Sequence, residues 1–361
     1  MRKTKAIVTA SIAASAFALL MGAPAPASAD GHTIEGPKVS WKFSTWGKRR
    51  AWTEGAEYLS QELSKRTNGN FKFKIYYGEQ LSKSKENLDG LAVGAFEAAS
   101  FCAAYHPKKN RALNVLDMPF LPIPNFDVQI AVSEAIYNHP IAQKNLSAWN
   151  TIPWFPSILP QYEYMGKGPA PKSVADFKGM RLRALGGMGR AAKAIGAIPT
   201  TVTASEGYNA LARGTVDAFG FPFTYAFSAY KLDEVSEWYT TNMKLGSVNC
   251  PIAFNMDAWN ALPKQYQALM NSLKPGMYKA MAIAYGKKDV ENLANWPKKM
   301  KAITISEAEM ANFRKIGGEP LWNQWVKENQ KHFDARALMD LVLSTAKEAA
   351  IKFPKAREYK D

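Results

Sequence analysis

Two arginines lie two residues apart, directly before a glycine-rich turn. Arg181 and Arg183 belong to Met180–Leu185, a short segment in which they alternate with apolar residues, as is typical of a strand. The turn Gly187–Ala192 then opens a predicted helix. Side chains alternate along a strand, so both arginines are expected on one face. Backbone N–H groups at a helix start attract anions, and a guanidinium pairs with a carboxylate through two hydrogen bonds. The sequence therefore predicts a carboxylate site at this turn.

The same turn also matches G-x-G-x-x-A, the pattern of dinucleotide-binding folds. It lies in the middle of the chain rather than after the first strand, and the acidic residue expected downstream is represented only by Glu206, which begins a predicted helix. A secreted nucleotide-dependent enzyme is accordingly the alternative from another class. An adhesion or scaffold protein without a small ligand is a third hypothesis.

The first residues have the features of an export signal. Arg2, Lys3 and Lys5 precede the apolar stretch Ala6–Leu20, and Ala27–Ala29 is an A-x-A cleavage pattern. Cleavage is predicted after Ala29, with the remaining chain in the periplasm. Removing these three positive charges lowers the formal net charge from +15 to +12.

The composition excludes several classes of protein. The chain has 361 residues, of which 47% are hydrophobic and 21% charged, which is typical of one large or two ordinary globular domains. Its positive charges are scattered in short runs such as Lys48–Arg50, interpreted as a solvated face, and no nucleic-acid motif accompanies them. We expect no nucleic-acid partner.

The usual signatures of catalysis and metal binding are missing from the sequence. None of the four histidines has metal-ligand spacing, no G-x-S-x-G pattern occurs, and no activated nucleophile or acid/base pair can be assembled. His106, which follows a predicted strand, is interpreted as structural, with a position facing a cleft as the alternative. The sequence predicts no enzyme, no metal and no cofactor.

Strands and helices alternate along the chain after the signal. A strand ends near Trp46, and the helix that follows has Leu59 and Leu63 on one face. A later strand, Phe96–Cys102, precedes Tyr105. This order predicts a parallel sheet whose ligands bind beyond the carboxyl ends of the strands. A second α/β unit follows, then a long helical stretch, Pro263–Asn295, with a kink or break at Pro275-Gly276, and a capping box at Ser306–Glu309.

Several ordered motifs resemble one known family. Phe177–Arg183 (FKGMRLR) is similar to the "LKGLKIR" strand of the DctP-type solute-binding proteins of tripartite ATP-independent periplasmic (TRAP) transporters. Further similar segments span most of residues 39–330: Gly78–Leu81, Asp117–Leu121, Gly196–Pro199, Ser205–Leu211, Gly214–Ala218, Asn255, Trp259–Pro263 and Phe313–Trp322.

The resemblance implies a two-domain periplasmic binding protein, type II-like, with α/β domains built on mostly parallel sheets. A long helix and crossing strands would span both domains. It implies domain I at 30–160 plus 250–290, domain II at 161–249 plus 291–340, and a C-terminal helix and tail at 341–361. Arg183 aligns with the family's ligand arginine, and the partners implied are membrane permease subunits. Some relatives dimerise, so monomer and homodimer both stay open.

Departures from the family pattern concern the ligand. The family's G-Q-E-N-P is replaced by Ala218–Pro222 (AFGFP), which puts Phe221 at a polar position with Phe223 close behind. A second arginine often found in the preceding strand is replaced near Tyr162–Tyr164, and Tyr162 is therefore a candidate site residue. Trp46 and Tyr105 follow strand ends. We therefore expect an aromatic pocket for a monocarboxylate with an apolar or aromatic body, with a dicarboxylate, a keto acid or an ectoine-like zwitterion as alternatives.

The chain has two cysteines. Cys102 ends one strand and Cys250 begins another, and the resemblance makes these strands neighbours in the sheet. A disulfide and two buried thiols are equally open from the sequence.

Overall fold

The computed structural model describes residues 33–359, and Thr33–Asp361 forms one compact unit. The predicted signal peptide lies outside the described residues. Within the described part, no helix has the length and apolar character needed to cross a membrane.

The first elements form where their hydrophobic periodicity predicts them. β1 (Val39–Ser44) buries Trp41 and Phe43, and α1 (Glu54–Arg66) buries Leu59 and Leu63 on one face. The helix ends where Asn68 and then Gly69 adopt positive φ, a conformation that glycine takes without a steric cost. This strand and helix therefore begin the fold as expected.

The first sheet carries the N-terminal strands together with one strand from later in the chain. In spatial order it comprises β2 (Phe71–Tyr76), β1, β3 (Ala98–Ser100), β10 (Ile252–Asn255) and β4 (Thr151–Phe155). β1 is parallel to β2 and β3, whereas β10 is antiparallel to both of its neighbours.

The second sheet has the same mixed character. In spatial order it comprises β11 (Lys301–Ile303), β9 (Trp238–Thr240), β5 (Tyr162–Gly166), β8 (Ala218–Pro222), β6 (Arg181–Arg183) and β7 (Ile198–Thr200). β5 is antiparallel to β8 and β9, and the other neighbours run parallel. The antiparallel strands, β5 and β10, are those by which the chain enters one sheet from the other, so each sheet is mixed.

Two connections cross between the sheets and meet at the start of β5. Residues 156–161 lead from β4 to β5, and residues 241–251 lead from β9 to β10. The backbone N–H of Tyr162, the first residue of β5, donates to Gly246 O at 2.7 Å, and that of Leu245 donates to Tyr162 O at 3.2 Å. The second crossing segment is therefore hydrogen-bonded to the residue at which the first one ends.

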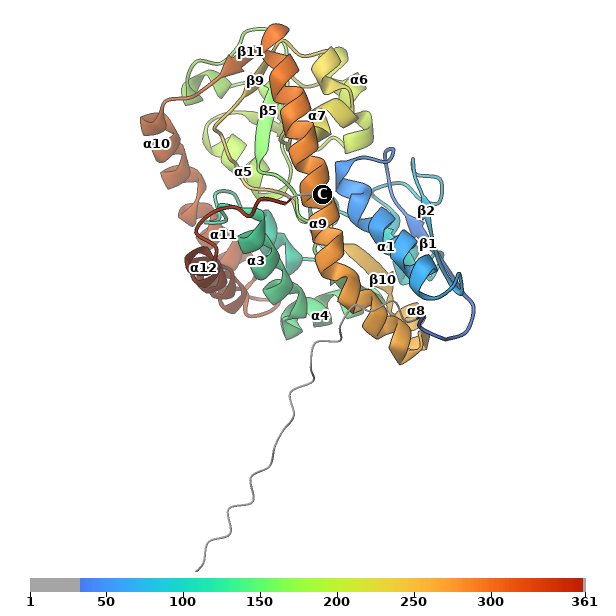
Figure 1. Cartoon of the computed structure of the whole chain (residues 1–361). Helices are drawn as coiled ribbons and strands as arrows, with labels where there is room; N and C mark the ends of the chain where they lie inside the picture. The colour runs from blue at the N-terminus through green and yellow to red at the C-terminus, as the bar shows by residue number, and fades with distance from the viewer. Residues whose placement is uncertain (1–32, 360–361) are drawn as a thin grey trace, which may run out of the picture. The chain divides into compact units, whose positions relative to one another are not determined.

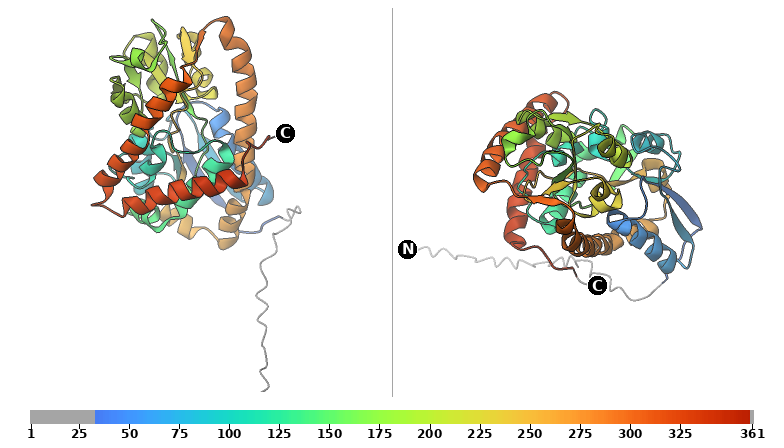
Figure 2. Two further views of the ribbon diagram at one scale, coloured as in Figure 1. Left: turned by 90° about the vertical axis from the view of Figure 1, so that its left-hand side faces the viewer. Right: turned by 90° about the horizontal axis from the view of Figure 1, so that it is seen from above.

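Helices cover both sheets. They are α2 (Asn87–Ala92), α3 (Phe126–Asn138), α4 (Pro140–Ser147), α5 (Gly186–Ala194), α6 (Gly207–Ala212), α7 (Tyr225–Ala229), α8 (Met256–Ala261), α9 (Lys264–Asn295), α10 (Glu307–Gly317), α11 (Glu319–Asn329) and α12 (Ala335–Lys352). Figure 1 shows α9 running past both sheets, and Figure 2 shows α12 crossing the half that holds α3, against which it packs.

The two-domain α/β fold, with a long helix and crossing segments, is confirmed. The helix start at Ser306 is also confirmed, since its side chain accepts a hydrogen bond from Glu309 N–H. Of the kink or break expected at Pro275-Gly276, the break is wrong: α9 continues through both residues, and Tyr58 packs over Gly276. The kink stays a prediction. The exact domain boundaries stay a prediction.

Candidate functional site

A cavity lies where the two sheets meet, and residues of both line it. We call it the central cavity; it is lined by Trp46, Arg50, Trp52, Cys102, Tyr105, Leu159, Tyr162, Arg183, Ala204, Phe221, Pro222, Tyr225, Ala226, Tyr230, Val248 and Cys250. Its empty volume is about 360 Å³. Aromatic side chains make up much of its lining.

The lining residues come from the carboxyl ends of strands. Trp46 follows β1, Tyr105 follows β3, and Arg183 is the last residue of β6. Phe221 lies near the end of β8, the parallel neighbour of β6. Open α/β sheets bind ligands at these ends, so the topology places the cavity where a ligand is expected.

Arg183 is almost completely buried at this cavity, with 1% of its surface exposed. Its Nε donates to Val202 O at 3.0 Å, its Nη1 to Gly220 O at 2.7 Å, and its Nη2 to the Tyr105 hydroxyl at 3.4 Å. The guanidinium carbon also lies 4.6 Å from the Phe219 ring centroid and 5.0 Å from that of Phe221. These contacts fix the orientation of the guanidinium.

No carboxylate among residues 33–359 forms an ion pair with Arg183. A buried charge without a partner costs free energy, which an anion entering the cavity would recover. The contacts above do not use all five N–H donors of a guanidinium, so donors remain for a carboxylate. The geometry suits a buried anion site.

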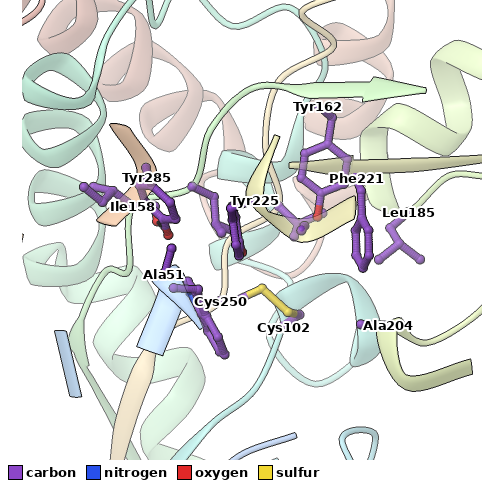
Figure 3. Packing of buried hydrophobic residues seen from close by; sticks show 14 of the residues in the cluster. Ala51, Cys102, Ile158, Tyr162, Leu185, Ala204, Phe221, Tyr225, Cys250 and Tyr285 are labelled. Carbon is purple, nitrogen blue, oxygen red and sulfur yellow. Dashed lines mark hydrogen bonds between the residues drawn. A yellow bond between two sulfur atoms is a disulfide. The ribbon is translucent and has the colours of Figure 1, made fainter. Parts of the chain in front are cut away.

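Aromatic rings form the walls beside Arg183. On one side the rings of Trp46 and Tyr105 lie 6.3 Å apart, and on the other those of Phe221 and Tyr230 lie 5.3 Å apart. Figure 3 shows Phe221 and Tyr162 near the disulfide and Tyr225 in this part of the core. Burial raises the pKa values of Tyr162, Tyr225 and Tyr230, so these phenols stay neutral.

Glu163, next to Tyr162 on β5, faces away from the cavity. Its carboxylate accepts hydrogen bonds from the Thr240 hydroxyl and from the N–H groups of Met243 and Lys244, which hold the second crossing segment. Burial raises its pKa to about 7. Side chains alternate along β5, so Tyr162 lines the cavity while Glu163 faces the second crossing segment.

Cys102 and Cys250 form a disulfide, which is one of the two states that the sequence left open. The bond links the segment after β3 to the segment before β10, which is the antiparallel neighbour of β3. It also lines the central cavity (Figure 3). The disulfide therefore braces the wall of the candidate site.

Arg50 is a cavity residue that the sequence analysis missed. The solvated face predicted for the run Lys48–Arg50 is wrong for Arg50, which lines the cavity. Arg49 does face solvent, where it pairs with Glu54 and Glu57. The signal available was position, because Arg50 follows the end of β1 by only a few residues.

Two predicted site residues do not reach the cavity. Arg181 is half exposed and paired with Asp217, because it begins β6, away from the strand's carboxyl end. Phe223 packs against Tyr239 and Trp296 in the core of the second sheet. The other five residues, Trp46, Tyr105, Tyr162, Arg183 and Phe221, come together around one space.

The glycine-rich turn is explained by packing between chain segments. A Cβ on Gly187 would lie 2.5 Å from Asp117 O and 2.8 Å from Met118 Cα. The segment 117–119 therefore occupies the space in front of α5, and the Asp117 carboxyl lies beside Gly186. The start of α5 faces this carboxyl, which contradicts both the expected ligand at the turn and a dinucleotide there.

His106 is buried and its ring packs edge-on against Phe101, outside the cavity lining. Desolvation by burial lowers its pKa to about 4. In the part of the chain that the structure describes, no group of three His, Cys, Asp or Glu side chains could hold a metal ion.

Comparisons with known proteins agree with this architecture. A family model described as "Bacterial extracellular solute-binding protein, family 7" matches residues 43–154 and 163–329. A monocarboxylate 2-oxoacid-binding periplasmic protein of Nostoc sp. is 26% identical over 278 residues, which cover 75% of this chain and 74% of that protein. A C4-dicarboxylate-binding periplasmic protein of Rhodobacter capsulatus is 25% identical over 289 residues, covering 77% and 79%.

A similar solved structure comes from an unidentified marine microbe. It is a TRAP solute binding protein specific for aromatic acid ligands, in complex with 3-hydroxybenzoate. The TM-score is 0.76 at 18% identity, with 87% of this chain and 99% of that chain covered, which shows the shared fold. These relatives and structures are transport binding proteins, so the enzyme alternative is wrong. Because the family model matches well over half of the chain, the protein belongs to the family 7 extracellular solute-binding proteins, the DctP-type binding proteins of TRAP transporters.

Proposed function

We propose that this protein captures a small organic acid with an apolar or aromatic body, whose carboxylate pairs with Arg183 while the two domains close over it. The observation that carries this proposal is the position of Arg183: a buried guanidinium without an ion-pair partner in the described residues, held by carbonyls at an aromatic cavity. A planar fork of donors matches two carboxylate oxygens, which a lysine ammonium does not.

The walls support an aromatic body for the ligand. Trp46, Tyr105, Phe221 and Tyr230 line the central cavity, and flat rings stack favourably on such side chains. A dicarboxylate, a keto acid and an ectoine-like zwitterion remain alternatives. Two arginines, Arg50 and Arg183, line the cavity, which keeps a dicarboxylate among the candidates.

Location and partners follow from the family. We propose that the signal is cleaved after Ala29, that the protein acts in the periplasm, and that it delivers its acid to TRAP permease subunits in the membrane. Monomer and homodimer both remain candidate states. The ligand is held without covalent chemistry, so release requires only that the domains open.

A thermal-shift screen tests the function. The probes are benzoate, phenylacetate, pyruvate, succinate, ectoine and NAD, with benzamide as the neutral control for the benzoate ring. A ligand at 100 times its Kd stabilises a folded protein by about 2.7 kcal/mol. We expect at least one aromatic acid to raise the melting temperature while benzamide and NAD do not. No shift with any acid, or an equal shift with benzamide, would contradict the proposal.

A further inference from the structure

We propose that the ligand is a flat aromatic acid with a second anionic group, and that Arg50 binds this group within the central cavity. This inference rests on the proposed function, because it takes the first carboxylate to be held by Arg183. Both guanidinium groups, those of Arg50 and Arg183, line the central cavity.

Two aromatic walls connect the arginines. Along one wall, Arg183 lies 5.0 Å from the Phe221 ring, Phe221 lies 5.3 Å from Tyr230, and Arg50 lies 5.4 Å from Tyr230. Along the other, the Arg183 Nη2 reaches the Tyr105 hydroxyl, Tyr105 neighbours Trp46, and Arg50 lies 6.0 Å from the Trp46 ring. Each series joins the two guanidinium groups through two aromatic rings, so Arg50 and Arg183 belong to one slot lined by these rings.

The charge of this slot is unbalanced. Among the described residues that line the cavity, none is acidic, and the buried tyrosines stay neutral because burial raises their pKa values. Arg50, like Arg183, forms no ion pair with a carboxylate in the range 33–359, whereas its neighbour Arg49 pairs with Glu54 and Glu57. A monoanion bound at Arg183 would leave the half-buried Arg50 without a carboxylate partner, and a dianion would pair with both guanidinium groups.

Arg50 also offers hydrogen-bond donors at a fixed place. The Arg50 Nη1 donates to Trp46 O at 2.8 Å and to Lys48 O at 2.7 Å, and its guanidinium carbon lies 4.7 Å from the Trp52 ring centroid. These contacts fix the group while its Nε and Nη2 have no hydrogen-bond partner in the described chain. The Tyr230 hydroxyl and the Arg50 guanidinium both lie beside Gly47. A Cβ on Gly47 would lie 2.6 Å from the Tyr230 hydroxyl and 3.0 Å from the Arg50 Nη1.

The Tyr230 hydroxyl is itself a second indication of a ligand. It is buried and has no hydrogen-bond partner in the described structure. A buried hydroxyl without a partner carries a free-energy cost, which an oxygen atom of the ligand would remove. The unpaired Arg50 guanidinium and the unpartnered Tyr230 hydroxyl together make a receptor for an anionic oxygen group.

Isothermal titration calorimetry with a matched ligand pair tests this inference. Isophthalate and 3-carbamoylbenzoate share shape and ring, but only isophthalate has a second negative charge; terephthalate and benzoate extend the series. We expect wild type to bind a benzenedicarboxylate about tenfold or more tightly than the carbamoyl analogue, because a hydrogen bond between charged groups is worth more than a neutral one. Arg50→Gln should remove this preference, and Arg50→Lys should keep part of it.

The control variant is Arg49→Gln, which alters the neighbouring arginine outside the cavity and should leave both affinities unchanged. Melting curves report whether each variant folds, and the ratio of the two affinities is insensitive to a general loss of the site. If Arg50→Gln lowers both affinities by the same factor, or if wild type binds both acids equally, Arg50 does not read a second charge and the inference is wrong. If no acid binds to wild type at all, the proposed function fails first.

Discussion

Arg181 and Arg183 lie two residues apart on β6, yet only Arg183 reaches the central cavity. Alternation correctly predicts that both side chains leave the same face of the strand. It does not predict how far along the strand a ligand lies, and Arg181, at the beginning of β6, pairs with Asp217 instead. Arg50 shows the converse, because a run of positive residues contains both a solvent-facing and a cavity-facing side chain.

His106 gives a pH-dependent prediction at the residue scale. Its pKa is lowered by burial to about 4, against 6.5 in an unfolded chain; nearby Asp89 opposes this shift and Lys109 adds to it. The unfolded chain therefore binds a proton below pH 6.5 that the folded protein does not take up until about pH 4. The stability contributed by neutral His106 is present above pH 6.5 and is lost as the pH falls toward 4.

Urea unfolding at pH 7.5 and pH 5 measures this effect. Between these values, wild type should lose about 2 kcal/mol more of its free energy of unfolding than His106→Gln does, since the glutamine does not titrate. Equal losses in the two proteins would show that His106 does not carry the pH dependence.

At the scale of elements, most strands and helices of the described chain form where periodicity predicts them. The strand expected at Phe96–Cys102 forms, but as the shorter β3. Residues 151–166 form β4, a crossing connection and β5, and no local pattern shows where a chain leaves one sheet for another. Three features depend on tertiary contacts, so the sequence alone could not predict them. These are the order of strands in each sheet, the antiparallel orientation of β5 and of β10 relative to their own neighbours, and the course of α9 past Pro275.

The glycines of α5 and α9 give a prediction at the scale of elements. A Cβ on Gly187 would lie 2.5 Å from Asp117 O, a backbone atom that cannot move aside cheaply, whereas nothing lies within 4 Å of a Cβ on Gly286 in α9. Gly187→Ala should therefore lower the free energy of unfolding by about 1–3 kcal/mol, the usual cost of overpacking. Gly286→Ala should raise it by up to about 1 kcal/mol, because alanine has the better helix propensity. Chemical denaturation of both variants checks this, and a Gly187→Ala protein as stable as wild type would show that segment 117–119 does not pack against the turn.

At the scale of the whole molecule, the central cavity depends on both halves of the fold. Trp46, Arg50 and Tyr105 follow strands of the first sheet, whereas Tyr162, Arg183 and Phe221 belong to the second. The crossing segments and the Cys102–Cys250 disulfide lie at this junction. In the proposed function, an acid held by Arg183 would contact residues of both sheets, and such contacts would favour the arrangement in which the two sheets enclose it.

The scattered positive charge of the chain is consistent with this arrangement. Most of its arginines in the described range are paired at the surface, as Arg49, Arg181 and Arg190 are, and these do not mark a site. Arg183 is distinguished by burial without an acidic partner in that range, and the half-buried Arg50 by its place in the cavity lining. Net charge alone could not have identified them, because it does not record which side chains are enclosed.

The most direct test of the account is isothermal titration calorimetry of Arg183→Gln with the aromatic acid that stabilises wild type most. Arg181→Gln, which removes the exposed arginine of the same strand, is the matched control. We predict that Arg183→Gln binds the acid at least about tenfold more weakly, since a charged hydrogen bond and a buried counter-charge are lost, while Arg181→Gln binds like wild type. Unchanged affinity in a folded Arg183→Gln protein would contradict the assignment of Arg183 as the anchor of the ligand carboxylate.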